Sequence, residues 1–347
     1  MSDRMSKSEF IALIAMMFAT IAFSLDAMLP ALPEIANELS PKDPNRAQLI
    51  LTSFVLGMGV GTLVVGPISD AFGRKNVIVV GSMVYIAGAA LAWFSQSLEI
   101  VLIARILQGL GAGAPRVVAL AIIRDLYQGR DMARIMSIAM MIFTIFPAFA
   151  PLLGTGIIAV IGWRGIFLAF ILFSLIVVTW MGLRLPETLP REKRRPVRLS
   201  LLVTSAAEIA RHPTVRLSIV VQTLAMGILF TMLTMVQPVY DEIFDKSETF
   251  PLFFGAVALV SGTSSLLNAK FVVRLGMRRI VTWSLALQIG LSAAILVLGF
   301  LPLSSSLYFA CFVIWQTSVF FIAGTTMGNL NAMAMEPMGH IAGTAAS

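Results

Sequence analysis

Charged residues are scarce in this chain of 347 residues, and their scarcity sets its class. Only 12% of the residues are Asp, Glu, Lys or Arg, whereas 58% are hydrophobic and the mean hydropathy is +0.90. Ordinary soluble domains carry about 25% charged residues. A soluble chain this apolar would lack a polar surface, so the composition predicts a protein that crosses a membrane several times.

Cysteine and histidine are also rare. The single cysteine, Cys311, excludes an internal disulfide and a cysteine metal cluster. His212 and His340 are far apart, so we expect no metal site and no cofactor. No GxxxxGK[ST], HExxH or GxSxG motif is present, which argues against direct use of ATP and against an intramembrane hydrolase, and we expect no enzyme. The net charge of +7 does not indicate nucleic acid, because the basic residues gather in loops on one side of the predicted spans.

A helix needs about 20 mainly apolar residues to cross a bilayer. Ten segments qualify, at 10–32, 47–66, 76–95, 99–123, 135–158, 163–184, 214–239, 250–272, 279–300 and 306–335. An eleventh begins near Pro337, and the sequence stops at Ser347. We therefore expect an all-α protein of the lipid bilayer, with ten spans and the start of an eleventh.

The distribution of Lys and Arg predicts the orientation, since these residues collect on the cytoplasmic side. Of the 25 Lys and Arg residues, nineteen fall on the side of the N-terminus. Lys42, Arg46, Arg164 and Lys246 fall on the other side, and Arg105 and Arg116 lie within a span. We expect the N-terminus in the cytoplasm.

The longest polar segment between spans divides the chain. It contains R-E-K-R-R-P over 191–196, a composition typical of a solvated linker and also of a segment that binds anionic lipid headgroups. We expect an N-terminal bundle at 1–185, a linker at 186–212 and an incomplete C-terminal bundle of four spans at 213–347. Gly73 and Gly276 each precede basic residues at the head of a span, which indicates a weak internal repeat.

One acid lies inside the first predicted span. Asp26 sits in S-L-D-A-M-L-P, and an ionised carboxylate in hydrocarbon costs several kcal/mol. It must therefore face a wet cavity, find a partner or bind a proton, and burial favours the protonated form of a carboxyl group. The alternative is a place near the outer membrane surface, because Glu34 follows two turns later. We favour a proton-linked acid.

Two arginines lie in the fourth predicted span. Arg105 opens R-I-L-Q-G and stays charged in nearly any setting, so it can shift the proton affinity of a nearby acid without releasing a proton itself. Arg116 follows about 16 Å later on the same face, with Gln108 close to that face. Arg116 either faces a cavity or extends to the inner membrane boundary.

Prolines and a glycine interrupt the fifth predicted span, in F-P-A-F-A-P-L-L-G over 146–154. Pro147, Pro151 and Gly154 weaken a helix and favour a kink. Kinked spans occur in many membrane proteins, so this motif alone does not identify a function.

A charged turn joins the second and third predicted spans. Gly66 and Pro67 are expected to end one helix, and Gly73 permits a backbone angle that a larger residue resists. The order G-P-x-S-D-x-x-G-R-K over 66–75 resembles the signature loop of the major facilitator superfamily of transporters. Its members of interest are Gly66, Asp70, Gly73, Arg74 and Lys75.

Further motifs narrow the resemblance to the drug:proton antiporter branch, and within it to the bicyclomycin/chloramphenicol-resistance (Bcr/CflA-type) subfamily. They are D-A-M-L-P-A-L-P from Asp26, R-I-L-Q-G from Arg105, R-D-L-Y from Arg124, A-P-L-L-G from Ala150, P-E-T-L from Pro186 and M-E-P-M-G-H from Met335. The resemblance implies two six-helix bundles that rock about a central cavity, exposing it to each side of the membrane in turn. It also implies a multi-pass protein of the bacterial inner membrane, and we expect a monomer.

The resemblance also implies roles for individual residues. Asp26 would be the proton-linked acid, and Arg105 the fixed charge that tunes it. Asp70 would hold a cytoplasmic gate closed through Arg74 and the positive N-terminal end of helix eleven. The antiporter-type kink would shape the seam between the bundles. The family's spans eleven and twelve are absent here, so we expect a fragment of a longer protein or a truncated product.

We therefore expect proton-coupled export (H⁺ antiport) of drugs or small amphipathic metabolites, with protons and a small-molecule substrate as partners. A facilitator or symporter for a polar nutrient is the alternative, as is a truncated membrane protein that does not transport. A nutrient site needs several converging polar groups, and the spans offer few. The candidates for a cavity are Gln108, Arg116, Gln222, Gln237 and Asn329.

Overall fold

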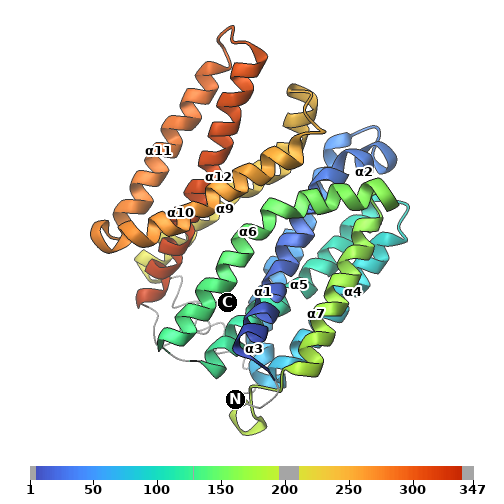
Figure 1. The fold of residues 1–347 in the computed structure, drawn as a ribbon, viewed down its shortest axis with the longest axis vertical. Coiled ribbons are helices and arrows are strands. Elements are labelled where there is room, and N and C mark those ends of the chain that lie inside the picture. The colour runs from blue at the N-terminus through green and yellow to red at the C-terminus, as the bar shows by residue number, and fades with distance from the viewer. Residues whose placement is uncertain (1–4, 128, 195–210, 338–347) are drawn as a thin grey trace. The chain divides into compact units, whose positions relative to one another are not determined.

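The structure, a computed structural model, describes residues 5–127, 129–194 and 211–337. Most side chains of the segment 129–147 are also outside the described set, although its helix is within it. The chain divides into two compact units, one within Met1–Arg198 and the other within Leu199–Ala346. Figure 1 shows that the regular structure of the described residues is helical in both units.

The described part of the first unit, 5–127 and 129–194, has six long helices and several short ones. The long helices are α1 (Lys7–Asp26), α3 (Leu49–Phe72), α4 (Arg74–Trp93), α5 (Leu98–Leu126), α6 (Gly129–Ile161) and α7 (Gly165–Arg184). The short ones are η1 (Leu29–Ala31), α2 (Leu32–Leu39), η2 (Pro44–Gln48) and η3 (Arg191–Lys193). Serine side chains cap two of the long helices: Ser6 accepts from the Glu9 N–H, and Ser97 accepts from the Ile100 N–H.

The second unit, described by itself, has four long helices within residues 211–337. They are α9 (Pro213–Pro238), α10 (Phe250–Leu275), α11 (Met277–Leu298) and α12 (Ser305–Met335). A π-helical turn, η4 (Val239–Ile243), follows α9 directly, and such turns are often found at functional sites. Helix α12 packs against all three of the other long helices, so it lies at the centre of this unit.

The predicted all-α membrane fold is confirmed. Among the described residues, nine helical segments are long and apolar enough to cross a membrane, and α6 covers the remaining predicted span at 135–158. The predicted eleventh span falls at residues 338–347, outside the described residues.

The predicted span at 10–32 lies within one apolar helical segment, Lys7–Leu39, in which α1 ends at Asp26 and the short helices η1 and α2 follow. One predicted boundary is wrong: Gly66 and Pro67 do not end a helix, since α3 runs on to Phe72 with Pro67 inside it. A proline inside a helix removes one backbone donor, and α3 nonetheless continues past Pro67 to Phe72. The break comes only at Gly73, with φ of 96°.

Glycines set the spacing of the helices around α5. A Cβ atom added to Gly57 of α3 would overlap the carbonyl oxygen of Ile106, and one added to Gly109 of α5 would overlap that of Phe54. These glycines therefore allow α3 and α5 to pack closely.

Helix α1 is the internal helix of the first unit. In its most apolar window 78% of the residues are buried, against 33% for the segment that contains α3. Its buried side chains, among them Leu13, Met17 and Phe18, belong to one apolar core with residues of α5 and α7. The apolar part of α1 is therefore enclosed by protein.

Candidate functional site

Asp26 is the last residue of α1, at the point where the helix breaks. Its exposed fraction is only 5%. Among the described residues, its carboxylate forms no hydrogen bond or ion pair. This side chain is therefore enclosed by protein.

Helix α6 approaches the break directly. A Cβ atom on Gly154 would overlap the carbonyl oxygen of Ala27 and lie 3.1 Å from its carbonyl carbon, so only glycine fits against the residue that follows Asp26. Pro151 is buried one turn before Gly154, and its carbonyl oxygen accepts a hydrogen bond from Thr155 Oγ1 at 3.0 Å. Figure 1 shows α6 bending along its length. The side chain of Pro147 is outside the described set.

Arg105 is completely buried and held from three sides. Its Nη2 donates to the Ser24 carbonyl oxygen at 2.9 Å, its Nη1 to Gln108 Oε1 at 2.6 Å, and its Nε to the Ile50 carbonyl oxygen at 3.3 Å. The guanidinium carbon also lies 4.3 Å from the centre of the Phe54 ring, within the range of a cation–π contact.

All three of these acceptors are uncharged. A buried guanidinium with only neutral partners keeps its positive charge available to a nearby acid. Through its bond to the Ser24 carbonyl oxygen, Arg105 contacts the backbone two residues before Asp26. Among the described residues, the side chains of Arg105 and Asp26 form no ion pair with each other.

Two residues of this site were missed from the sequence. The oxygen atoms of Ser24 and Tyr85, both buried, lie 2.6 Å apart. Ser24 Oγ also donates to the Thr20 carbonyl oxygen at 2.6 Å, which uses its one hydrogen, so the Tyr85 hydroxyl must be the donor to Ser24. The available signal was a serine two residues before Asp26 and a lone tyrosine in the third span.

The remaining cavity candidates of the first unit lie on α5. Gln108 is fully buried, and its Nε2 has no hydrogen-bond partner among the described residues. Arg116 lies further along the helix and is partly buried.

The charged turn forms a second site, at the end of the first unit where α4 begins. Arg74 Nη1 donates to Asp70 Oδ1 at 2.5 Å and to Ser69 Oγ at 2.6 Å, and Arg74 Nε donates to Asp125 Oδ2 at 3.0 Å. The predicted contact between Asp70 and Arg74 is present. Asp125 was missed as a partner, although it lies in the quoted motif R-D-L-Y. The predicted contact with helix eleven falls outside the described residues.

The segment after α7 completes this second site. Lys75 Nζ donates to the carbonyl oxygens of Gly182 and Leu185, at 2.5 and 3.2 Å, near the end of α7. Glu187 accepts from backbone N–H groups at the start of α4. Gly66 lies seven residues before Gly73 within α3, so it belongs to the helix and not to the turn.

Three candidates lie in the second unit. Gln222 is partly buried on α9, and Gln237 is 3% exposed with no partner for its Oε1 among the described residues. Asn329 of α12 is bonded: its Nδ2 donates to Asn268 Oδ1 at 2.7 Å. Near Gln237 in sequence, the Tyr240 hydroxyl donates to Gln316 Oε1 at 2.9 Å.

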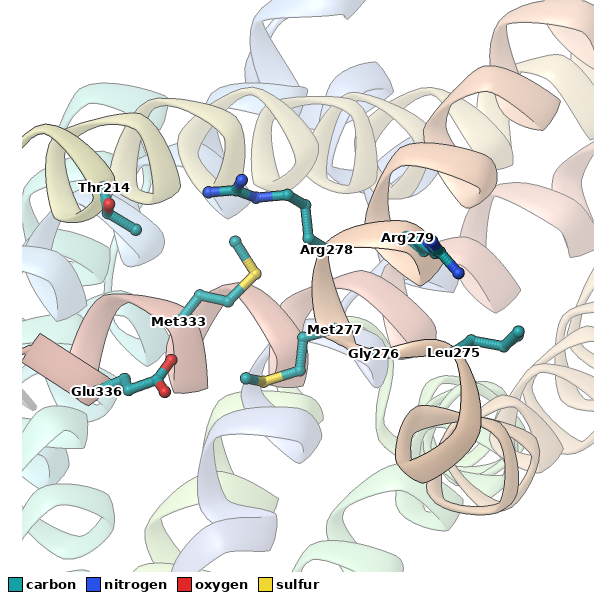
Figure 2. Close-up of a pocket in the computed structure, with 8 residues that line it drawn as sticks. All are labelled: Thr214, Leu275, Gly276, Met277, Arg278, Arg279, Met333 and Glu336. Atoms are coloured by element: carbon teal, nitrogen blue, oxygen red, sulfur yellow. The ribbon is translucent and has the colours of Figure 1, made fainter.

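Two adjoining hollows also lie in the second unit. One, of about 440 Å³, is at the start of α11, and Figure 2 shows the side chain of Arg278 extending from that helix toward Thr214 of α9. The other, of about 650 Å³, is a mostly apolar groove between α9, α11 and α12. None of the predicted site residues lines either hollow. Among the described residues, no three His, Cys, Asp or Glu side chains come together as metal ligands do.

Comparisons with known proteins agree with this architecture. A family model described as Major Facilitator Superfamily matches residues 12–347. The chain is 29% identical to a bicyclomycin resistance protein homolog of Haemophilus influenzae, over 100% of this chain and 86% of that protein. It is 33% identical to a chloramphenicol resistance protein of Pseudomonas aeruginosa, over 54% of this chain and 45% of that protein.

A solved structure is also similar in fold. The crystal structure of a D-xylose-proton symporter matches 97% of this chain and 87% of its own, with a TM-score of 0.67 and 14% identity. At this identity the likeness supports the fold alone.

Proposed function

Because the chain belongs to the major facilitator superfamily, we propose that it exports drugs or small amphipathic metabolites from the cell in exchange for protons. Membership confirms the family predicted from the sequence, and it makes the protein a multi-pass membrane transporter and not an enzyme. The resistance proteins among its relatives support drugs as the substrate class.

The single observation that carries proton coupling is the burial of Asp26, two residues after the Ser24 carbonyl oxygen that binds Arg105. An ionised carboxylate in such a place lacks water and has no hydrogen-bond donor among the described residues. Binding a proton removes that cost, whereas the positive field of Arg105 opposes protonation. The two effects act against each other, so the site can both take up and release a proton.

The break at Asp26 connects this chemistry to movement. The acid ends α1, and the next residue is in close contact with Gly154 of α6, so a change of charge acts where two helices meet. We propose that the protonated and ionised forms of Asp26 favour opposite orientations of the transporter, as alternating access requires.

We further propose the placement and organisation of the protein. It lies in the bacterial inner membrane with its N-terminus in the cytoplasm, acts as a monomer and uses no cofactor. Its bundles span 1–185 and 213–347, joined by a linker at 186–212. Pro151 and Gly154 shape the junction of α6 with α1. The candidates for contact with substrate are Gln108 and Arg116 in the first bundle, and Gln222, Gln237 and Asn329 in the second.

The test is an export assay in a bacterium that lacks its own drug pumps. Cells that express the chain should accumulate less ethidium or chloramphenicol than cells with an empty vector, and a protonophore should abolish the difference. Asp26→Asn should remove uphill export while the protein remains in the membrane. Asp43→Asn, a matched change at an exposed acid, should export normally. Export that survives the protonophore, or normal pumping by Asp26→Asn, would overturn the proposal.

A further inference from the structure

The segment Pro186–Leu189, which follows α7, contacts the charged turn in an arrangement that the roles proposed above do not use. Glu187 Oε1 accepts from the Arg74 N–H at 2.9 Å and from the Leu189 N–H at 3.0 Å. Glu187 Oε2 accepts from the Lys75 N–H at 3.1 Å. One carboxylate thus binds the first two backbone donors of α4 from 112 residues away.

These donors have no acceptor within their own helix. The first backbone N–H of α4 with an acceptor in its own turn is that of Val77, which donates to the Gly73 carbonyl oxygen at 3.4 Å. A carboxylate at a helix N-terminus is favourable both as an acceptor and through the helix dipole. Glu187 therefore supplies the cap that α4 lacks, since its own N-cap residue, Gly73, has no side chain.

Gly73 leaves the space that the carboxylate fills. A Cβ atom there would lie 2.7 Å from Glu187 Oε2 and 2.6 Å from Arg194 Nη2, so the glycine is required by contact as well as by its positive φ. The turn and the carboxylate fit each other.

The neighbouring residue reaches the other side of the same network. Thr188 Oγ1 donates to Asp125 Oδ2 at 3.1 Å, and that oxygen also accepts from Arg74 Nε. Lys75 of α4 in turn donates to two carbonyl oxygens near the end of α7. The segment Gly182–Glu187 and the start of α4 therefore satisfy free backbone groups of each other.

The second unit offers an internal comparison. Gly276 precedes α11 with φ of 79° and ψ of 150°, close to the 96° and 151° of Gly73 before α4. Among the described residues, no side chain accepts from the N–H groups that follow Gly276, and a hollow lies there instead. The same backbone turn therefore forms at Gly276 without a carboxylate. Glu187 is thus not required for the turn at Gly73 to form, and its contacts with α4 have a different role.

We propose that Glu187 and Thr188 are positioning residues for transport. Glu187 fixes the backbone of Arg74, Thr188 fixes the carboxylate of Asp125, and together they set how Arg74 bridges Asp70 and Asp125. This inference rests on the proposed function, because the bridged turn is taken to hold the transporter in one orientation. Loss of either residue should therefore change the rate of reorientation more than the binding of substrate.

The first test is amide hydrogen exchange at the start of α4, measured by mass spectrometry on the full chain in lipid nanodiscs. Glu187→Gln keeps the size of the side chain but loses the charge and one acceptor, and the amides of Arg74 and Lys75 should exchange about tenfold faster, as for a lost helix cap. Glu192→Gln, the same change at an exposed glutamate five residues on, should leave them unchanged. Equal exchange in Glu187→Gln and the wild type would overturn the proposed cap.

The second test separates kcat from KM in ethidium export. Glu187→Gln and Thr188→Val should change kcat at least threefold with KM nearly constant, and Thr188→Ser, which keeps the hydroxyl, should restore the wild-type rate. A Thr188→Ser variant as impaired as Thr188→Val, or a change confined to KM, would overturn the positioning role. If the wild-type chain exports nothing, the proposed function fails, and the exchange experiment still decides whether Glu187 holds the start of α4.

Discussion

The contact between Gly154 and Ala27 makes a quantitative prediction about the junction of α1 and α6. In Gly154→Ala the new methyl carbon would overlap the Ala27 carbonyl oxygen, and it would lie 3.1 Å from the carbonyl carbon and 3.2 Å from the Cα. Carbon atoms prefer separations of about 3.5–4.0 Å. The helices must therefore separate by at least about 0.5 Å, and the backbone that carries Asp26 must move with them.

The cost follows from the packing around this point. Adding a methyl group to a closely packed interior typically destabilises a protein by about 1–3 kcal/mol. Gly156, two residues along the same helix, is the matched control, because nothing lies within 4 Å of a Cβ atom there. In Gly156→Ala the gain in helix propensity should stabilise by about 0.5–1 kcal/mol. The two variants should differ by roughly 1.5–4 kcal/mol, with opposite signs relative to the wild type.

Thermal unfolding of the purified protein in detergent measures the difference, and ethidium export in cells measures its functional consequence. Gly154→Ala should unfold at a lower temperature than the wild type and export poorly, and Gly156→Ala should match or exceed the wild type in both. A Gly154→Ala protein as stable and active as Gly156→Ala would show that α6 does not press against the end of α1, and the account of the Asp26 site would then fail.

Three further predictions concern other contacts. Arg105→Lys should abolish export and lower the unfolding temperature, because an ammonium group cannot reproduce three hydrogen bonds that are each worth about 1.5–3 kcal/mol. Arg46→Lys, at an exposed ion pair, is the control in both assays. Equal behaviour of the two variants would contradict the anchoring of Arg105 by these bonds. Gly57→Ala should destabilise the protein in thermal unfolding by about 1–3 kcal/mol or more, whereas Gly59→Ala, with open space around it, should not; equal melting temperatures would argue against the close contact of α3 with α5. Gly73→Ala should impair folding and export more than Gly276→Ala, since both strain the backbone but only the first also meets Glu187; a larger defect at Gly276 would refute the comparison.

Hydropathy was sufficient to predict the helices, because a span needs a long apolar run whatever its neighbours are. It could not predict where a helix stops inside an apolar run. The break after Asp26 is invisible to hydropathy, and Pro67, which the sequence suggested as a helix end, sits within α3. Both outcomes depend on packing between helices that lie far apart in the sequence.

The candidate site was predicted in its residues but not in its contacts. Asp26 and Arg105 stand out because charges are costly in a membrane, and this argument needs no structure. The partners of Arg105 are mainly backbone carbonyl oxygens, which every residue carries, so no sequence pattern identifies them. Glu187 was likewise hidden, since its partners are backbone N–H groups of a distant helix.

The anchoring of Arg105 also has an evolutionary consequence. Two of its three acceptors belong to the backbone at Ser24 and Ile50, so the side chains at those positions can change over generations without removing an acceptor from the arginine. Gln108 has no such freedom, because its side chain is itself the acceptor. Among homologous transporters, the residue at position 108 should therefore vary much less than the residue at position 50. At positions 24 and 50, selection should conserve the backbone conformation more strongly than the side chain.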